Sequence, residues 1–310
     1  MYEDQLSGRS RWALTAACIL VLGAAGCDIT KLTAESTAGL FERAAPAFEE
    51  YWDYDLAGEA LPATIVQLEG ILRIAPDNDA LLAQLSQAYF GYAYGWIDVD
   101  VEALEFEGKY DEADAQRRRA RIMYLRSKDL TMHRISLLHP GVYDATRGSV
   151  EELQAWLEES FVEKSDAPLL LWAGQAWGAY VNTAKDDMVA VADLPYAKAV
   201  VERSIALDPD YYHAAGYLFM GIVTASEMAA DLDAAKAYFE KALDSTERRA
   251  LMTQVSMARY YAVQTGNRTL FDELIAEVLE AGDVLPEARL ANRMARERAE
   301  LYTAYADQLF

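Results

Sequence analysis

Few residues in this chain belong to the types that perform covalent or metal chemistry. His133, His139 and His213 are the only histidines, and the first two are six residues apart, a spacing that does not place both on one helical face. Cys18 and Cys27 are the only cysteines, and both lie near the N-terminus. The sequence contains no Gly-x-Ser-x-Gly, no glycine-rich phosphate loop and no His-Glu-x-x-His. We therefore expect no enzyme activity, no metal site and no cofactor.

Acidic residues form the next group that could bind a ligand. Asp98, Asp100 and Glu102 alternate with valines in the manner of a calcium loop, but the glycine that such a loop needs for its sharp turn is absent. We expect an acidic solvated linker at this position. The acid pairs at 151–152 and 158–159 are interpreted as the wet face of a helix, because acidic residues at a helix start are favoured by the macrodipole.

Aromatic side chains are the unusual feature, with 19 tyrosines and 6 tryptophans in one chain. Tyr89, Tyr92 and Trp96 are spaced i, i+3 and i+7, so they share a helical face. A second stripe is formed by Ala173, Trp177, Tyr180 and Ala184, with Trp172 on its flank. Their ordinary role would be packing in the core, since aromatic rings bury much surface. The alternative is a ring-lined groove or channel that binds an apolar ligand or a partner helix. The candidate ligand- or partner-binding residues are Tyr89, Tyr92, Trp96, Trp172, Trp177 and Tyr180.

Composition limits the class of protein that could carry these residues. Hydrophobic residues make up 53% of the 310 residues, and glycine and proline contribute only 17 and 8 positions, which excludes a disordered or collagen-like chain. The 50 acidic residues outnumber the 28 Lys and Arg, giving a net charge of −22. This excess of negative charge repels phosphate backbones, so we expect no nucleic-acid partner.

Helices must position these side chains. From residue 39 onward apolar residues recur at intervals of three and four, and no alternation long enough for a strand is present. Prolines and glycines separate the periodic segments. The pattern predicts an all-α fold. The expected helices are 39–55, 59–74, 78–98, 109–138, 149–163, 167–184, 195–207, 210–229, 232–244, 247–264, 268–281 and 286–309.

Several of these segments share a pattern of small, large and small residues followed by proline. The spacing is that of the second helix of a tetratricopeptide repeat, where small residues let two helices approach closely. The clearest copy is Ala197, Val201, Ser204 and Pro209. Ala235, Phe239 and Ala242 repeat the spacing, but Glu247 stands where the proline would be. A third, partial copy lies at 68–76. We predict a degenerate tetratricopeptide-like array of helical hairpins, an α-solenoid, with a non-repeating helical bundle as the alternative.

The N-terminus has the features of a targeting segment. Arg9 and Arg11 precede an apolar run at 12–22, which is too short to span a bilayer. Residues 22–27 resemble a bacterial lipobox, and an ordinary cleaved secretory signal is the alternative. We therefore expect a signal peptide at 1–26, lipid on Cys27 followed by a polar tether through residue 38, and one helical domain at 39–310. Acyl chains on Cys27 would attach the protein to a membrane.

Residues 72–78, 81–82 and 88–93 resemble the opening repeat of the T-component family of TRAP transporters. The resemblance covers about residues 40 to 300. The further matching segments are 117–121, 124–125, 170–172, 176–178, 191–195, 207–211, 237–243 and 258–262.

The resemblance implies a lipoprotein accessory of a tripartite ATP-independent periplasmic uptake system. Such a protein would face the periplasm from the bacterial cell envelope and bind the solute-binding (P) subunit. It would conduct an apolar or organic-acid ligand through an aromatic-lined interior. The family resemblance, together with the aromatic-rich surface, favours a homotrimer. The alternative function is a repeat scaffold for cell-envelope or outer-membrane assembly.

Overall fold

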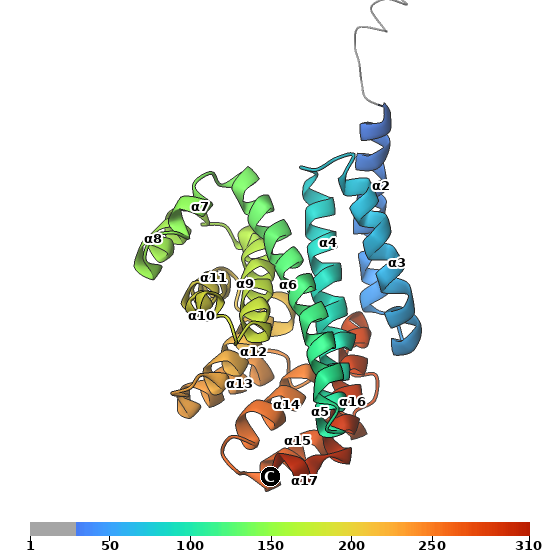
Figure 1. Ribbon diagram of the computed structural model, residues 1–310, viewed down its shortest axis with the longest axis vertical. Coiled ribbons are helices and arrows are strands. Elements are labelled where there is room, and N and C mark those ends of the chain that lie inside the picture. The colour runs from blue at the N-terminus through green and yellow to red at the C-terminus, as the bar shows by residue number, and fades with distance from the viewer. Residues whose placement is uncertain (1–28) are drawn as a thin grey trace, which may run out of the picture.

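The computed structural model describes residues 29–310, in which all regular elements are helices and no strand is present (Figure 1). The first half contains α2 (Ile29–Glu49), α3 (Tyr54–Leu72), α4 (Asp79–Tyr92), the π-helix η1 (Ala93–Ile97), α5 (Asp98–Phe106), α6 (Tyr110–Leu138), α7 (Val142–Ala145) and α8 (Val150–Ser160). The second half contains η2 (Lys164–Asp166), α9 (Ala167–Thr183), α10 (Met188–Ala192), α11 (Leu194–Leu207), α12 (Tyr211–Ser226), α13 (Leu232–Ser245), α14 (Met252–Ser256), the π-helix η3 (Met257–Ala262), α15 (Arg268–Glu280), η4 (Pro286–Ala288), α16 (Arg289–Ala304) and α17 (Ala306–Leu309). The expected all-α class is confirmed.

The N-terminal helix begins earlier than the sequence indicated. Helix α2 starts at Ile29, so residues 29–38, which we expected to form a polar tether, are helical. Ala34 and Ala38 of this segment are buried, and the Gln84 side chain donates a hydrogen bond to the Ala38 carbonyl. The expected signal peptide at 1–26 and the expected lipid site at Cys27 lie outside the described residues.

Successive long helices pack side by side along the chain. Helix α4 packs against α3 and α6, α9 against α6 and α11, and α12 against α11 and α13 (Figure 1). The predicted repeat positions lie where helices come closest: Ala197 and Val201 are fully buried. A Cβ at Gly174 of α9 would lie 2.4 Å from Val201 Cγ2 and 3.0 Å from the Ala197 carbonyl oxygen. These small residues therefore allow α9 and α11 to pack closely.

Helix α16 returns to the N-terminal helices, where it packs against α2, α3 and α5. Arg289 donates a hydrogen bond to the Glu50 carbonyl (2.8 Å), Arg293 donates one to the Trp52 carbonyl (3.2 Å), and Arg298 donates one to the Tyr94 carbonyl. Arginine is suited to such bridges because its planar group carries several donors on a long stem. The C-terminal helix α16 is thereby joined to the first helices of the described chain.

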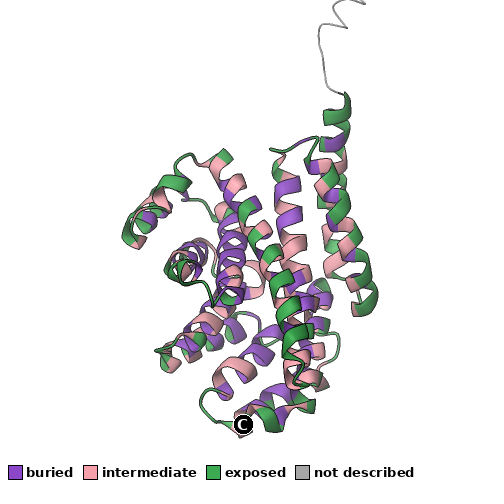
Figure 2. Ribbon diagram, in the orientation of Figure 1, coloured by how far each residue is buried: buried purple, intermediate pink, exposed green. Residues whose placement is uncertain are grey.

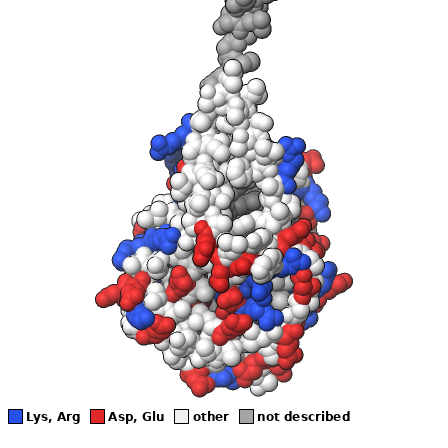
Figure 3. Space-filling model, turned by 90° about the vertical axis from the view of Figure 1, so that its right-hand side faces the viewer, with Lys and Arg blue, Asp and Glu red and all other residues white. Residues whose placement is uncertain are grey.

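The central helices are more deeply buried than the outer ones. Helix α9 is buried along nearly its whole length, whereas α3 and α8 expose their outer sides (Figure 2). The α2 and α3 side of the molecule carries few charges in its upper part and mixed acidic and basic residues below (Figure 3). This face is also hollowed near its middle (Figure 3).

Candidate functional site

Four ionisable side chains meet inside the array: Asp98 and Glu102 of α5, Arg259 of η3 and Arg298 of α16. We call these residues the charged cluster. Both π-helical turns contribute to its surroundings, because η1 leads into α5 and η3 carries Arg259. Single π-turns inside α-helices occur often at functional sites, since they redirect side chains that a regular helix would place elsewhere.

Asp98 is partly buried and accepts a hydrogen bond of 2.6 Å from the Tyr124 hydroxyl. Burial raises the pKa of Asp98 to about 6, and the opposing effects of the Tyr124 hydrogen bond and the Arg298 charge only partly offset it. The expectation of an acidic solvated linker at 98–102 is therefore wrong. These residues form the first turns of α5, and Asp98 and Glu102, four residues apart, face inward.

The two arginines differ in how their donors are used. Arg259 Nε lies 3.4 Å from Glu102 Oε1, an ion pair without the alignment of a hydrogen bond. Glu102 also accepts a hydrogen bond of 2.7 Å from Tyr302. Arg298 is only 5% exposed, and its guanidinium carbon lies 4.4 Å from the centre of the Tyr94 ring. Its Nη1 has no acceptor among residues 29–310. A buried donor without an acceptor is costly, so the cluster is incompletely satisfied.

A continuous row of rings leads away from Arg298. Tyr94 stacks on Phe90 with 5.7 Å between ring centres, Phe90 contacts Trp172 edge-on at 5.7 Å, and Trp172 contacts Tyr212 at 4.9 Å. We call Tyr94, Phe90, Trp172 and Tyr212 the ring row. Its three members other than Trp172 are only half-buried. Burial raises the pKa of the Tyr94 and Tyr212 hydroxyls, although both side chains keep some accessible surface.

The backbone is strained at Tyr212, the last member of the ring row. Tyr212, His213 and Ala214 at the start of α12 have φ values of 48°, 57° and 58°. The left-handed conformation costs about 1–2 kcal/mol for each residue other than glycine. Strain of this kind is concentrated at ligand-binding and switch regions, where packing holds it in place. Here it coincides with the contact of the Tyr212 ring with Trp172.

The six aromatic residues selected from sequence lie in three places. Trp172 belongs to the ring row. Tyr92 and Trp96 stack with centres 5.9 Å apart, and Trp96 stacks on Tyr54 at 5.1 Å. Tyr89 lies on the same side of the molecule, where its hydroxyl donates to Glu69 Oε1 at 3.0 Å.

The third place is around Lys128, whose ammonium lies 4.8 Å from the Trp177 ring centre and 5.3 Å from that of Tyr180. Trp177 is buried and donates a hydrogen bond to Asp193 at 2.9 Å. The structure thus keeps Tyr89, Tyr92 and Trp96 together and separates Trp172 from Trp177 and Tyr180. Ligand binding by these residues stays a prediction.

The sequence pattern singled out Asp98 and Glu102 but gave no sign of Arg259 and Arg298, and it missed three members of the ring row. Arg259 and Arg298 lie more than 150 positions after Asp98, so no local spacing connects them. A weak signal did exist: an acidic pair at i, i+4 next to the aromatic run 89–96 would face the same side as part of that run. Tyr212 could not be found, because its left-handed backbone has no glycine to mark it.

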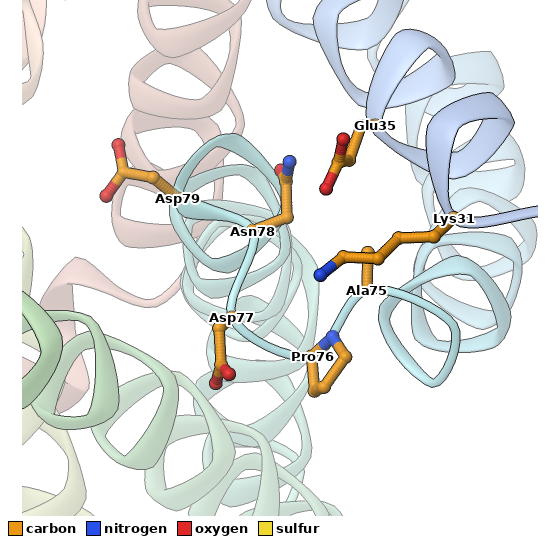
Figure 4. A pocket seen from close by; sticks show the side chains of 7 residues that line it. All are labelled: Lys31, Glu35, Ala75, Pro76, Asp77, Asn78 and Asp79. Carbon is orange, nitrogen blue, oxygen red and sulfur yellow. The ribbon is translucent and has the colours of Figure 1, made fainter. Parts of the chain in front are cut away.

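The two most clearly formed surface pockets lie away from these residues. One, of about 260 Å³, is lined by the start of α2 and the α3–α4 turn, where Lys31 and Glu35 extend over residues 75–79 (Figure 4). The other, of about 470 Å³, lies between the α13–α14 turn and the end of α15. Both are bordered largely by charged and polar groups, and neither contains a candidate aromatic residue.

No group of three or more His, Cys, Asp or Glu side chains within residues 29–310 is arranged to hold a metal ion. No helix in the same range has the length and apolar character needed to cross a membrane.

Comparison with known families identifies the chain as a transporter component. The family model of the TRAP transporter T-component matches residues 50–310, most of the sequence. The chain belongs to this family, as the sequence resemblance indicated. A comparison with curated proteins finds no match. Membership implies association with a TRAP transporter, and it places the protein in a transport system of a membrane-bounded envelope.

Proposed function

We propose that this protein is a lipid-anchored, periplasm-facing accessory of a TRAP-type uptake system that docks the solute-binding subunit and passes a ligand through its interior. Family membership supports the transport role. The ring row supports the interior path, because its rings contact one another in sequence and three of the four are only partly buried. The proposal requires no catalysis, since rings and fixed charges bind a ligand without altering it.

The proposed architecture is a tetratricopeptide-like solenoid that α16 closes. The close contact of α9 with α11 at Gly174, and the full burial of Ala235, Phe239 and Ala242, support the repeat interpretation. Stacked helical hairpins leave a concave inner surface, which repeat proteins commonly use for binding. In this protein the inner surface would carry the charged cluster and the ring row.

The docking part of the proposal is tested by co-purification. The full chain with a C-terminal affinity tag is expressed in its own host and recovered from detergent-solubilised membranes. Recovery of a periplasmic solute-binding subunit is expected. Recovery of barrel-assembly proteins without any solute receptor would instead favour an envelope scaffold and would contradict the transport role.

The anchor is tested in the same cells. Cys27→Ser is expected to move the protein from the membrane fraction to the soluble periplasmic fraction, because one acylated cysteine is the proposed attachment. Retention of the variant in the membrane fraction would contradict lipid anchoring at this residue. Cys18→Ser, within the expected signal segment, is the matched control and is expected to leave the distribution unchanged.

A further inference from the structure

The end of the molecule at which α2 begins is built from three segments that are far apart in the sequence (Figure 1). The start of α2 lines a pocket together with the α3–α4 turn (Figure 4). Near the end of α6, Arg134 donates hydrogen bonds of 2.5 and 2.8 Å to Asp79 of the same turn. His133 Nε2 lies 2.9 Å from Asp77 Oδ1. We call residues 29–36, 73–79 and 133–147 together the α2 end.

Large apolar side chains are exposed on all three segments of the α2 end. At the start of α2 every residue from 29 to 33 is exposed, so this turn keeps accessible surface on every side. A group of exposed apolar side chains at one end of a molecule indicates a contact with a partner or a membrane. The exposed apolar residues of the α2 end are Ile29, Leu32, Ile74, Leu137, Leu138 and Tyr143.

The α2 end is also electrically neutral, although the whole chain has a net charge of −22. With histidine counted as neutral, its four basic residues are balanced by four acidic ones. A membrane that contains anionic lipids repels an acidic surface, and this repulsion acts over about a Debye length. The α2 end therefore approaches such a membrane with less repulsion than the rest of the protein. The charged residues concerned are Lys31, Arg73, Arg134, Arg147, Glu35, Asp77, Asp79 and Asp144.

Chain geometry places the α2 end next to the proposed lipid on Cys27. Helix α2 begins at Ile29, two positions after Cys27, and two residues span at most about 7 Å. The acyl chains of a lipidated cysteine enter the hydrocarbon region of the bilayer. A polar tether through residue 38 would have held the domain at a distance, but these residues are helical. The first turn of α2 would therefore lie at the level of the lipid headgroups.

We infer that the α2 end lies on the membrane surface, with Ile29 and Leu32 among the lipid headgroups and the α3–α4 turn and the α6–α7 corner against the bilayer. The inference rests on the lipid anchor of the proposed function and goes beyond it by naming the surface that fixes the orientation of the protein. The acyl chains supply the affinity, and the protein surface supplies the orientation. Cys27→Ser is therefore still expected to leave the membrane.

The test measures how close chosen positions lie to the lipid. The full chain is purified from the membranes of its own host and placed in vesicles of phosphatidylethanolamine and phosphatidylglycerol. A fraction of the lipids carries a nitroxide quencher near the headgroup. A fluorophore is attached at Leu138→Cys or, as the control, at Val284→Cys. No cysteine within residues 29–310 competes for the label, because the chain has cysteines only at positions 18 and 27.

Val284 is a suitable control because it lies near the opposite end of α2. Its neighbour Asp283 forms an ion pair of 2.6 Å with Arg289, and Arg289 donates a hydrogen bond of 2.8 Å to the Glu50 carbonyl. The 21 residues of α2 span about 30 Å. Quenching at Leu138 is therefore expected to exceed quenching at Val284 several-fold. Equal quenching at the two positions would overturn the inference, because the protein would then have no fixed orientation on its anchor.

A matched pair of variants tests whether apolar contact fixes the orientation. The fluorophore is placed at Ile74→Cys, and circular dichroism is used to check that each variant is folded. Leu138→Glu is expected to reduce quenching several-fold, because it places a charge in the proposed contact. Leu56→Glu, at the start of α3, is the control and is expected to leave quenching unchanged; Leu138 is 51% exposed and Leu56 is 47% exposed. Unchanged quenching in Leu138→Glu would contradict the inference.

Co-flotation of the protein with the vesicles reports on the anchor separately. A wild-type protein that does not co-float would contradict both the lipid anchor and the inference. A protein that co-floats but is quenched equally at Leu138 and Val284 would leave the anchor intact and overturn only the inference. A fluorophore at Leu138 whose emission moves to shorter wavelength without quenching would show that a second copy of the chain covers the α2 end, which would also overturn it.

Discussion

Asp98 provides a quantitative test of the buried interior. Its pKa rises from an ordinary value of 3.8 to about 6 because burial disfavours the charged form, against the opposing effects of Tyr124 and Arg298. Glu102 adds to the rise and Arg117 reduces it. The folded protein therefore binds more protons than the unfolded chain between pH 3.8 and about 6. The contribution of this group to the free energy of unfolding must fall as pH rises through that window.

The size of the effect follows from the shift. About two pKa units correspond to about 3 kcal/mol, at roughly 1.4 kcal/mol per unit. Asp98→Asn removes the titration and keeps an acceptor for the Tyr124 hydroxyl. We expect the variant to match the wild type near pH 4 and to exceed its free energy of unfolding by up to about 3 kcal/mol at pH 7.5.

The assay is urea unfolding followed by far-ultraviolet circular dichroism at half-unit steps from pH 4 to pH 8. The control is Asp129→Asn, which removes an exposed carboxylate of α6 and is expected to give a small difference that does not vary with pH. A difference between Asp98→Asn and the wild type that stays constant across the range would refute the burial of Asp98 as a charged group. If the difference in the free energy of unfolding grew toward low pH instead, the pKa of Asp98 would be lowered by folding, which contradicts the prediction.

Two further predictions concern packing and capping, and both are measured by urea unfolding. Gly174→Ala is expected to lower the free energy of unfolding by about 1–3 kcal/mol, because the new Cβ overlaps Val201; Gly70→Ala, whose Cβ meets nothing within 4 Å, is the matched control and is expected to stabilise by up to about 1 kcal/mol. A stabilised Gly174→Ala would show that α9 and α11 are further apart than described. Ser149→Ala is expected to destabilise by about 1 kcal/mol, since Ser149 and Glu152 form a reciprocal capping box at the start of α8, and no loss would mean that the cap is not formed in solution.

Much of the helical pattern could be predicted because it depends on local sequence. The expected segments 167–184, 232–244 and 268–281 correspond closely to α9, α13 and α15. Side-chain caps such as Asp231 and Asn267 mark their starts, and these follow from residue type alone.

The differences arise where distant residues decide the outcome. The segment predicted as one helix at 78–98 is extended through a π-turn into α5, which reaches Phe106. Asp98 is a solvated residue by local pattern, and only packing against Tyr124 and Arg298 places it inside. The strained start of α12 has no local signal either, because Tyr212, His213 and Ala214 all prefer right-handed backbone. Groups of residues that share a helical face could therefore be predicted from their spacing. Contacts between residues far apart in the sequence could not.

The most direct test of the account is a binding titration between the full chain in nanodiscs and the solute-binding subunit of the same transport system, with and without solute. We predict saturable association in at least one of the two states and a measurable change in affinity when solute is present, because a protein that receives cargo must distinguish a loaded receptor from an empty one. Absence of association in both states would contradict the central claim.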